Sequence, residues 1–202
     1  MRVQAKDIAI ALILMFASYS GHTLSADTSD ASSKFEIGLA LSGIQLPGPS
    51  TFGIGGRAVF NVNPAMSLEG EGNFFFNDAV PNIQSGGHAA EGLFGAKLGY
   101  RSDKVGVFGK VRPGLISFSN AIQNATFSLS TPPFLSIQTG RRTRPALDLG
   151  AVIEFYPAKH WAWRSDLGDT MIFYDSTNFL GIRIPGEKRN TFQFGTGLEY
   201  RF

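Results

Sequence analysis

The chain has 202 residues, the length of one ordinary domain, and no shift in composition indicates a second domain. Its formal net charge of +2 argues against a nucleic-acid partner, and the absence of cysteine excludes a disulfide framework or a thiolate metal site. Gly and Phe are abundant, at 24 and 18 residues, and only 17% of the residues are charged. This composition favours short strands and tight turns over helices.

The first 26 residues have the pattern of a signal peptide. Arg2 and Lys6 precede an apolar run from Ile8 to Ser18, and small residues follow it. The run is shorter than the roughly 20 apolar residues that a spanning helix needs. We therefore expect residues 1–26 to be removed and residues 27–202 to form the mature protein, which has no later apolar run long enough for a spanning helix.

Apolar and polar residues alternate along most of the remaining chain, which predicts eight β-strands. The predicted strands are Lys34–Ile44, Phe52–Val62, Met66–Phe76, Ala89–Tyr100, Val105–Phe118, Pro145–Tyr156, Trp161–Tyr174 and Thr191–Phe202. Each is long enough to cross a bilayer when tilted. Short, turn-rich links alternate with longer ones, and the longest predicted loop is Ser119–Arg144. We predict an all-β fold, an eight-stranded antiparallel up-and-down transmembrane β-barrel, with the short turns and both chain ends at one rim.

The same alternation predicts two faces for the barrel wall. On the last strand Phe192 and Phe202 belong to the outward parity, whereas Glu199 belongs to the inward one. Many glycines share the inward parity, which suits a narrow interior. Ten inward charged residues are predicted to form an ion network in the lumen: Glu69, Glu71, Lys97, Lys110, Arg112, Asp148, Arg164, Asp166, Glu199 and Arg201.

Aromatic residues near the strand ends are predicted to form two girdles at the membrane interfaces. One girdle contains Phe60, Tyr100, Phe155, Trp161, Trp163, Tyr200 and Phe202, and the other contains Phe52, Phe76, Phe118, Phe173 and Phe192.

The hairpin EGLFGAKLGYRSDKVGVFGKVRPGL, from Glu91 to Leu115, and the ending LEYRF resemble the small eight-stranded outer-membrane barrels related to the OmpA transmembrane domain and OmpX. The resemblance implies a monomer in a bacterial outer membrane, in contact with its lipids. It also implies that Tyr200 and Phe202 belong to a C-terminal signal for the barrel-assembly machinery.

Side chains just fill the bore of an eight-stranded barrel, so crossing charges favour a plugged lumen. The expected function is a structural or surface-interaction role without a cofactor, metal or catalytic residue. A narrow, porin-like pore for small solutes is the alternative. An outer-membrane lipid A deacylase would use a His and Ser pair, but neither His88 nor His160 is followed by Ser two residues later. We therefore do not expect an enzyme.

Basic residues gather where two of the predicted strands begin at the rim with the long loops. Guanidinium groups bind phosphate in a bidentate manner. The sequence therefore predicts a collar that contacts lipopolysaccharide, made of Arg141, Arg142, Arg144, Lys188 and Arg189.

Overall fold

The structure is a computed structural model, which describes residues 33–46, 50–79, 81–129, 134–179 and 182–202. The predicted signal peptide lies outside these residues. Within the described part of the chain, no helix has the length and apolar character needed to cross a membrane.

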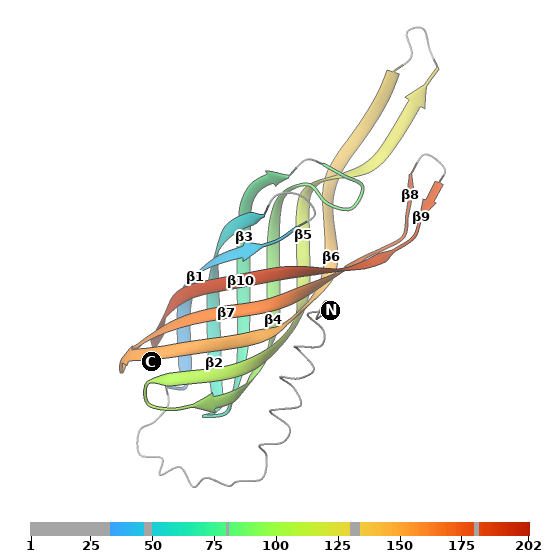
Figure 1. Ribbon diagram of the computed structural model, residues 1–202. Helices are drawn as coiled ribbons and strands as arrows, with labels where there is room; N and C mark the ends of the chain where they lie inside the picture. Colours follow the sequence, from blue (N-terminus) through green and yellow to red (C-terminus); the bar gives the residue numbers. More distant parts are fainter. Residues whose placement is uncertain (1–32, 47–49, 80, 130–133, 180–181) are drawn as a thin grey trace, which may run out of the picture. The chain divides into compact units, whose positions relative to one another are not determined.

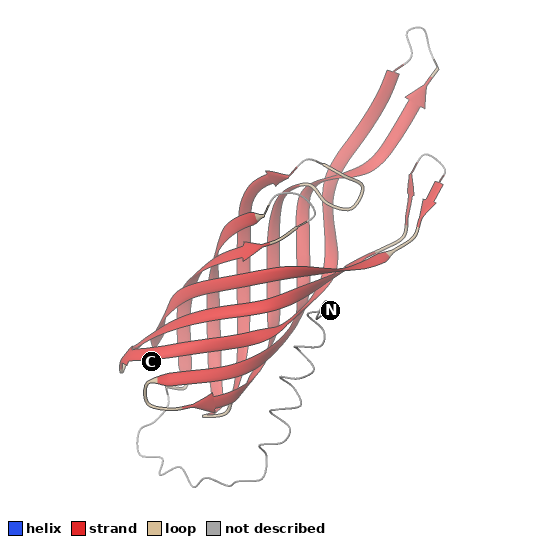
Figure 2. Ribbon diagram, in the orientation of Figure 1, coloured by secondary structure: helices blue, strands red, loops and turns tan. Residues whose placement is uncertain are grey.

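The described residues form ten β-strands (Figures 1 and 2). They are β1 (Phe35–Ile44), β2 (Thr51–Asn63), β3 (Met66–Ala79), β4 (Gly87–Arg101), β5 (Val105–Ser128), β6 (Phe134–Ala158), β7 (Trp161–Tyr174), β8 (Thr177–Phe179), β9 (Ile182–Ile184) and β10 (Glu187–Arg201). Eight of them form a closed antiparallel barrel in the order β1-β10-β7-β6-β5-β4-β3-β2, and β8 pairs with β9 in a separate hairpin. The predicted eight-stranded barrel is confirmed.

The last strand of the barrel closes against the first. In this seam Glu36 is the register partner of Arg201, and Ile44 is the partner of Gln193. Beyond the last paired residue, the backbone N–H of Phe202 donates to the carbonyl oxygen of Phe35 at 3.0 Å. The alternating pattern therefore continues to Phe202 because this end of the chain is part of the barrel wall.

Three short links join β2 to β3, β4 to β5 and β6 to β7. They lie at one rim, together with the start of β1 and the end of β10 (Figure 1). We call this rim the turn end of the barrel and the opposite rim the loop end. The predicted alternation of short and long connections is confirmed.

The two faces of the wall agree with the alternation. Apolar side chains predicted to face outward are exposed, for example Leu39, Phe94 and Leu198, whereas the inward charged side chains are largely buried. Phe118 is an exception to the predicted girdles because it lies inside the barrel, with 1% of its surface exposed. It has the inward parity of Arg112 on the same strand.

The predicted loop Ser119–Arg144 is wrong. β5 and β6 continue past the barrel wall as a two-stranded hairpin, and their register extends to Ser128 paired with Phe134 (Figure 1). The prediction ended the first of these strands at Phe118 and began the second at Pro145. Pairing between the two strands does not depend on the membrane, so it persists beyond the residues that cross it. The short hairpin β8–β9 was also missed.

Candidate functional site: the charged lumen

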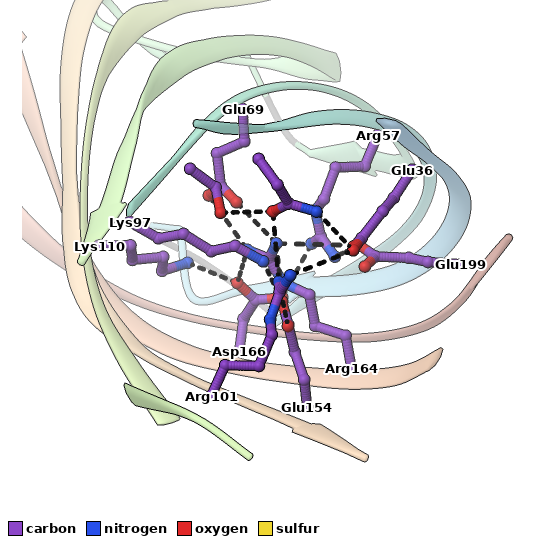
Figure 3. A network of polar contacts seen from close by, with 12 residues as sticks. Glu36, Arg57, Glu69, Lys97, Arg101, Lys110, Glu154, Arg164, Asp166 and Glu199 are labelled. Carbon is purple, nitrogen blue, oxygen red and sulfur yellow. Dashed lines mark hydrogen bonds and ion pairs between the residues drawn. The ribbon is translucent and has the colours of Figure 1, made fainter. Parts of the chain in front are cut away.

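Fourteen charged side chains on the inward parity form one connected set of ion pairs, which we call the lumen network. Figure 3 shows the central part of this network. Its seven acids are Glu36, Glu69, Glu71, Asp148, Glu154, Asp166 and Glu199. Its seven bases are Arg57, Lys97, Arg101, Lys110, Arg112, Arg164 and Arg201. All ten side chains predicted for such a network belong to it.

Arg164 and Arg57 connect opposite walls at the centre of the network. Arg164 on β7 makes a bidentate contact with Glu69 on β3, at 2.6 and 3.0 Å, and donates to Asp166 at 2.9 Å. Arg57 on β2 contacts Glu71, Asp166 and Glu199 at 2.6 to 3.0 Å. Planar guanidinium groups can bind several carboxylates at once. These contacts therefore tie strands from both sides of the barrel across its axis.

Towards the loop end, Arg112 bridges two strands. Its Nε and Nη2 lie 2.8 and 2.6 Å from Asp148 Oδ2, and its Nη1 lies 2.5 Å from Glu71 Oε2. Lys110, two residues earlier on β5, lies 2.9 Å from Asp148 and 3.2 Å from Asp166. The acids of this region therefore share their basic partners.

Towards the turn end, Glu154 is the main acceptor. It pairs with Lys97, lies 3.2 Å from Arg101, and accepts a 2.6 Å hydrogen bond from the Tyr156 hydroxyl. The Arg201 guanidinium lies 4.5 Å from the centre of the Tyr156 ring, a cation–π distance. The sequence prediction missed Arg101, which it assigned to a turn. Arg101 lies four residues after Lys97 and therefore has the same inward parity, a signal that could have identified it.

A polar layer without ion pairs lies next to the network on the side of the loop end. Glu91 Oε2 accepts hydrogen bonds from Asn73 Nδ2 at 3.0 Å and from Gln193 Nε2 at 2.8 Å. Ser42 donates to Asn73 Oδ1 at 2.9 Å, and Thr170 donates to Gln193 Oε1. The sequence analysis did not single out these residues, although all five have the inward parity.

An apolar cluster, which we call the plug, follows the polar layer. Its members are buried: Ile44, Leu46, Phe75, Ala89, Ile116, Phe118, Ala146, Ile172 and Tyr174. On four strands a plug residue lies two positions nearer the loop end than a residue of the polar layer: Ser42 and Ile44, Asn73 and Phe75, Glu91 and Ala89, Thr170 and Ile172. Two positions along a strand keep the same face. The lumen is therefore lined in turn by charged, polar and apolar side chains.

No family model and no curated protein matches the chain. Solved structures do resemble it. Neisserial surface protein A (NspA) is 9% identical with a TM-score of 0.58, and the alignment covers 86% of this chain and 100% of that one. Ail of Yersinia pestis, in complex with the heparin analogue sucrose octasulfate, is 15% identical with a TM-score of 0.50 over 86% and 100%. The N-terminal β-barrel domain of Pseudomonas aeruginosa OprF is 13% identical with a TM-score of 0.50 over 85% and 100%.

The fold is that of a small outer-membrane β-barrel. At these identities the likeness concerns the fold alone. The apolar side chains exposed around this outer-membrane barrel agree with a wall that faces lipid. Both observations support the predicted location in a bacterial outer membrane.

Aromatic rings line the seam of the outer-membrane barrel at its turn end. Phe202 lies 5.9 Å from Phe35 and 5.0 Å from Tyr200, measured between ring centres, and Tyr200 lies 5.3 Å from Trp161. All four rings face outward and are exposed. Aromatic side chains favour the membrane interface. The assembly role of Tyr200 and Phe202 stays a prediction.

Of the two histidines among the described residues, His88 lies on the outer face of β4 and His160 lies in the turn between β6 and β7. His88 Nδ1 is 2.9 Å from the carbonyl oxygen of Phe76, and His160 Nδ1 is 3.0 Å from that of Arg201. Glu91 is three residues from His88 on the same strand, and its side chain faces the lumen. The structure does not bring these two groups together, since they lie on opposite faces of the wall.

The predicted basic collar is not one surface. Arg142 donates to the carbonyl oxygen of Ile83 at 3.1 Å and to Thr177 at 2.9 Å, and Arg144 is buried and lies 2.7 Å from Asp175. Arg189 pairs with Glu187 at 2.6 Å. The prediction treated neighbouring arginines as a loop, but in β6 successive side chains point to opposite faces. Arg141 remains exposed on the outward parity, and Lys188 is the register partner of the outward Phe173.

Proposed function

We propose that this protein is a non-conducting and non-enzymatic barrel of the outer membrane, with a structural or surface-interaction role. The observation that supports the proposal is the set of charged and apolar side chains that point into the bore. Arg57 and Arg164 reach across the axis of the lumen network, Arg112 links β5 to β3 and β6, and the plug follows towards the loop end. A barrel of this size has little space that side chains do not occupy.

The surface role rests on the β5–β6 hairpin, which continues beyond the wall at the loop end. Its segment 117–140 contains no Asp, Glu, Lys or Arg, and Leu135 and Ile137 are exposed on it. Exposed apolar side chains on an ordered extracellular element are a common feature of contact surfaces.

Planar-bilayer recordings test the closed lumen. The wild-type barrel should give no stepwise conductance, because the filled bore has no continuous path for hydrated ions. A matched variant, Glu69→Ser with Arg164→Ser, removes one acid and one base from the centre and should conduct in small steps. Retention of the folded form on an unboiled gel serves as the control for both proteins. Stepwise conductance of the wild type, with steps as large as those of the variant, would instead favour the narrow pore.

We also propose lipid contacts for the two outward basic residues. Arg141 and Lys188 flank the apolar wall at the loop end, where phosphate groups of lipopolysaccharide lie in an outer membrane. Replacing both with Gln should lower the amount of co-purifying lipopolysaccharide. Arg144→Gln is the control, because this buried guanidinium pairs with Asp175 and should leave that amount unchanged. Equal lipopolysaccharide in all three proteins would contradict the proposal.

A further inference from the structure

One inward acid of the lumen has no basic partner among the described residues. Each acid of the lumen network has at least one basic partner, and its seven acids match seven bases. Glu91 is an eighth inward acid, and no ion pair joins it to any basic group of the described residues. Every Lys and Arg after residue 32 is among those residues. No basic group of residues 33–202 that the structure describes therefore forms an ion pair with Glu91.

The surroundings of Glu91 do not compensate its charge. The residue is 4% exposed, and its Oε2 accepts hydrogen bonds from two neutral amides. Its Oε1 is buried and has no hydrogen-bond partner among the described residues. The plug residue Ile116 is the register partner of Glu91 on β5, and Ala89 follows on the side of the loop end.

The charged groups that face Glu91 come from the strands β3, β5 and β6. Glu71 on β3 and Asp148 on β6 are acids, and Arg112 on β5 is already bound between them. The groups from β1, β7 and β10 are the neutral side chains of Ser42, Thr170 and Gln193. The neighbouring side chains therefore do not stabilise a negative charge on Glu91.

An ionised carboxylate in such a place is costly. Desolvation of a buried charge costs several kcal/mol unless an opposite charge is close, and neutral amide donors offset only part of that cost. We propose that Glu91 is a binding site for one monovalent cation, either a proton or an alkali metal ion, taken from solution when the barrel folds. Buried Asp148 Oδ1, which also has no hydrogen-bond partner among the described residues, is a second oxygen of this region.

Glu91→Gln tests the site because the carboxamide has nearly the same shape, needs no counter-charge and keeps an oxygen for Asn73 and Gln193. A ligand that binds only the folded state raises stability by mass action. In choline chloride, raising the pH should therefore lower the unfolding midpoint of the wild type more than that of Glu91→Gln. All other titratable groups are common to both proteins, so the comparison isolates position 91.

Two measurements distinguish the cations. If a proton occupies the site, the infrared spectrum of the wild type contains the carbonyl stretch of a protonated carboxylic acid, and Glu91→Gln lacks it. If an alkali ion occupies it, that band is missing, and sodium chloride raises the wild-type unfolding midpoint above its value in choline chloride of equal concentration. Glu199→Gln, which removes a paired acid, is the control and should retain either signature.

Absence of both the infrared band and the sodium effect in the wild type would overturn the proposal, whether or not the Gln variant folds. The site does not depend on the proposed function, because conductance of the barrel would leave both signatures of Glu91 unchanged.

Discussion

Arg112→Ala is expected to lower the free energy of unfolding by about 3–5 kcal/mol, the usual cost of removing one partner from a buried ion pair. Arg112 lies 1% exposed between Glu71 and Asp148 and also contacts Glu69 at 3.2 Å. Without it three acids compete for the remaining bases. Urea titration in detergent micelles can follow unfolding through the fluorescence of Trp161 and Trp163, which face outward on β7.

Arg141→Ala is the matched control, since this side chain is exposed and no ion pair joins it to the described residues. A surface substitution of this kind changes stability by less than about 0.5 kcal/mol. Adding Asp148→Ala to Arg112→Ala should restore part of the lost stability, because the pair is then removed as a whole. Equal stability of Arg112→Ala and Arg141→Ala would mean that the lumen network does not stabilise the barrel.

Gly95→Ala is expected to lower the free energy of unfolding by about 1–3 kcal/mol, as overpacking of a tight interior does. Gly95 has the inward parity on β4, and a Cβ there would overlap the carbonyl oxygen of Val111 and crowd the Cα of Arg112. The backbones of β4 and β5 would have to separate where Arg112 is held. The same urea titration measures the loss.

Gly92→Ala on the same strand is the control. Its Cβ would point outward and meet no atom within 4 Å. Alanine also restricts the unfolded chain more than glycine does, so we expect unchanged or slightly higher stability, by up to about 1 kcal/mol. If the two alanine variants lose equal stability, the close approach of β4 and β5 is not the reason for glycine at position 95.

Local patterns were sufficient for the wall of the barrel. An alternation of period two predicts that Leu39 and Phe94 face outward and that Glu69 and Arg164 face inward. Successive side chains of a strand point to opposite faces. The pattern is clear because side chains that face lipid are apolar, whereas those that face the narrow lumen are mostly polar or charged. Parity also indicates which glycines line the interior, such as Gly95.

Errors arose at the ends of the predicted strands and in the predicted turns. Arg101 was assigned to a turn, and the strands of the β5–β6 hairpin were ended at the membrane boundary. Arg142 and Arg144 were grouped with Arg141, although the extended strand separates them by face. In each case pairing between strands carried the alternation further than the local signal indicated.

The sequence by itself determined the number of strands in the barrel, the two faces of its wall and most of the charges inside it. Only the tertiary structure decided which charges meet. Arg164 and Glu69 are 95 residues apart and come together because barrel closure and stagger set the height of each strand. The same closure leaves Glu91 between two neutral amides, with no ion pair to a basic group of the described residues. Parity gives the face of a side chain, but its height in the lumen depends on every register around the barrel.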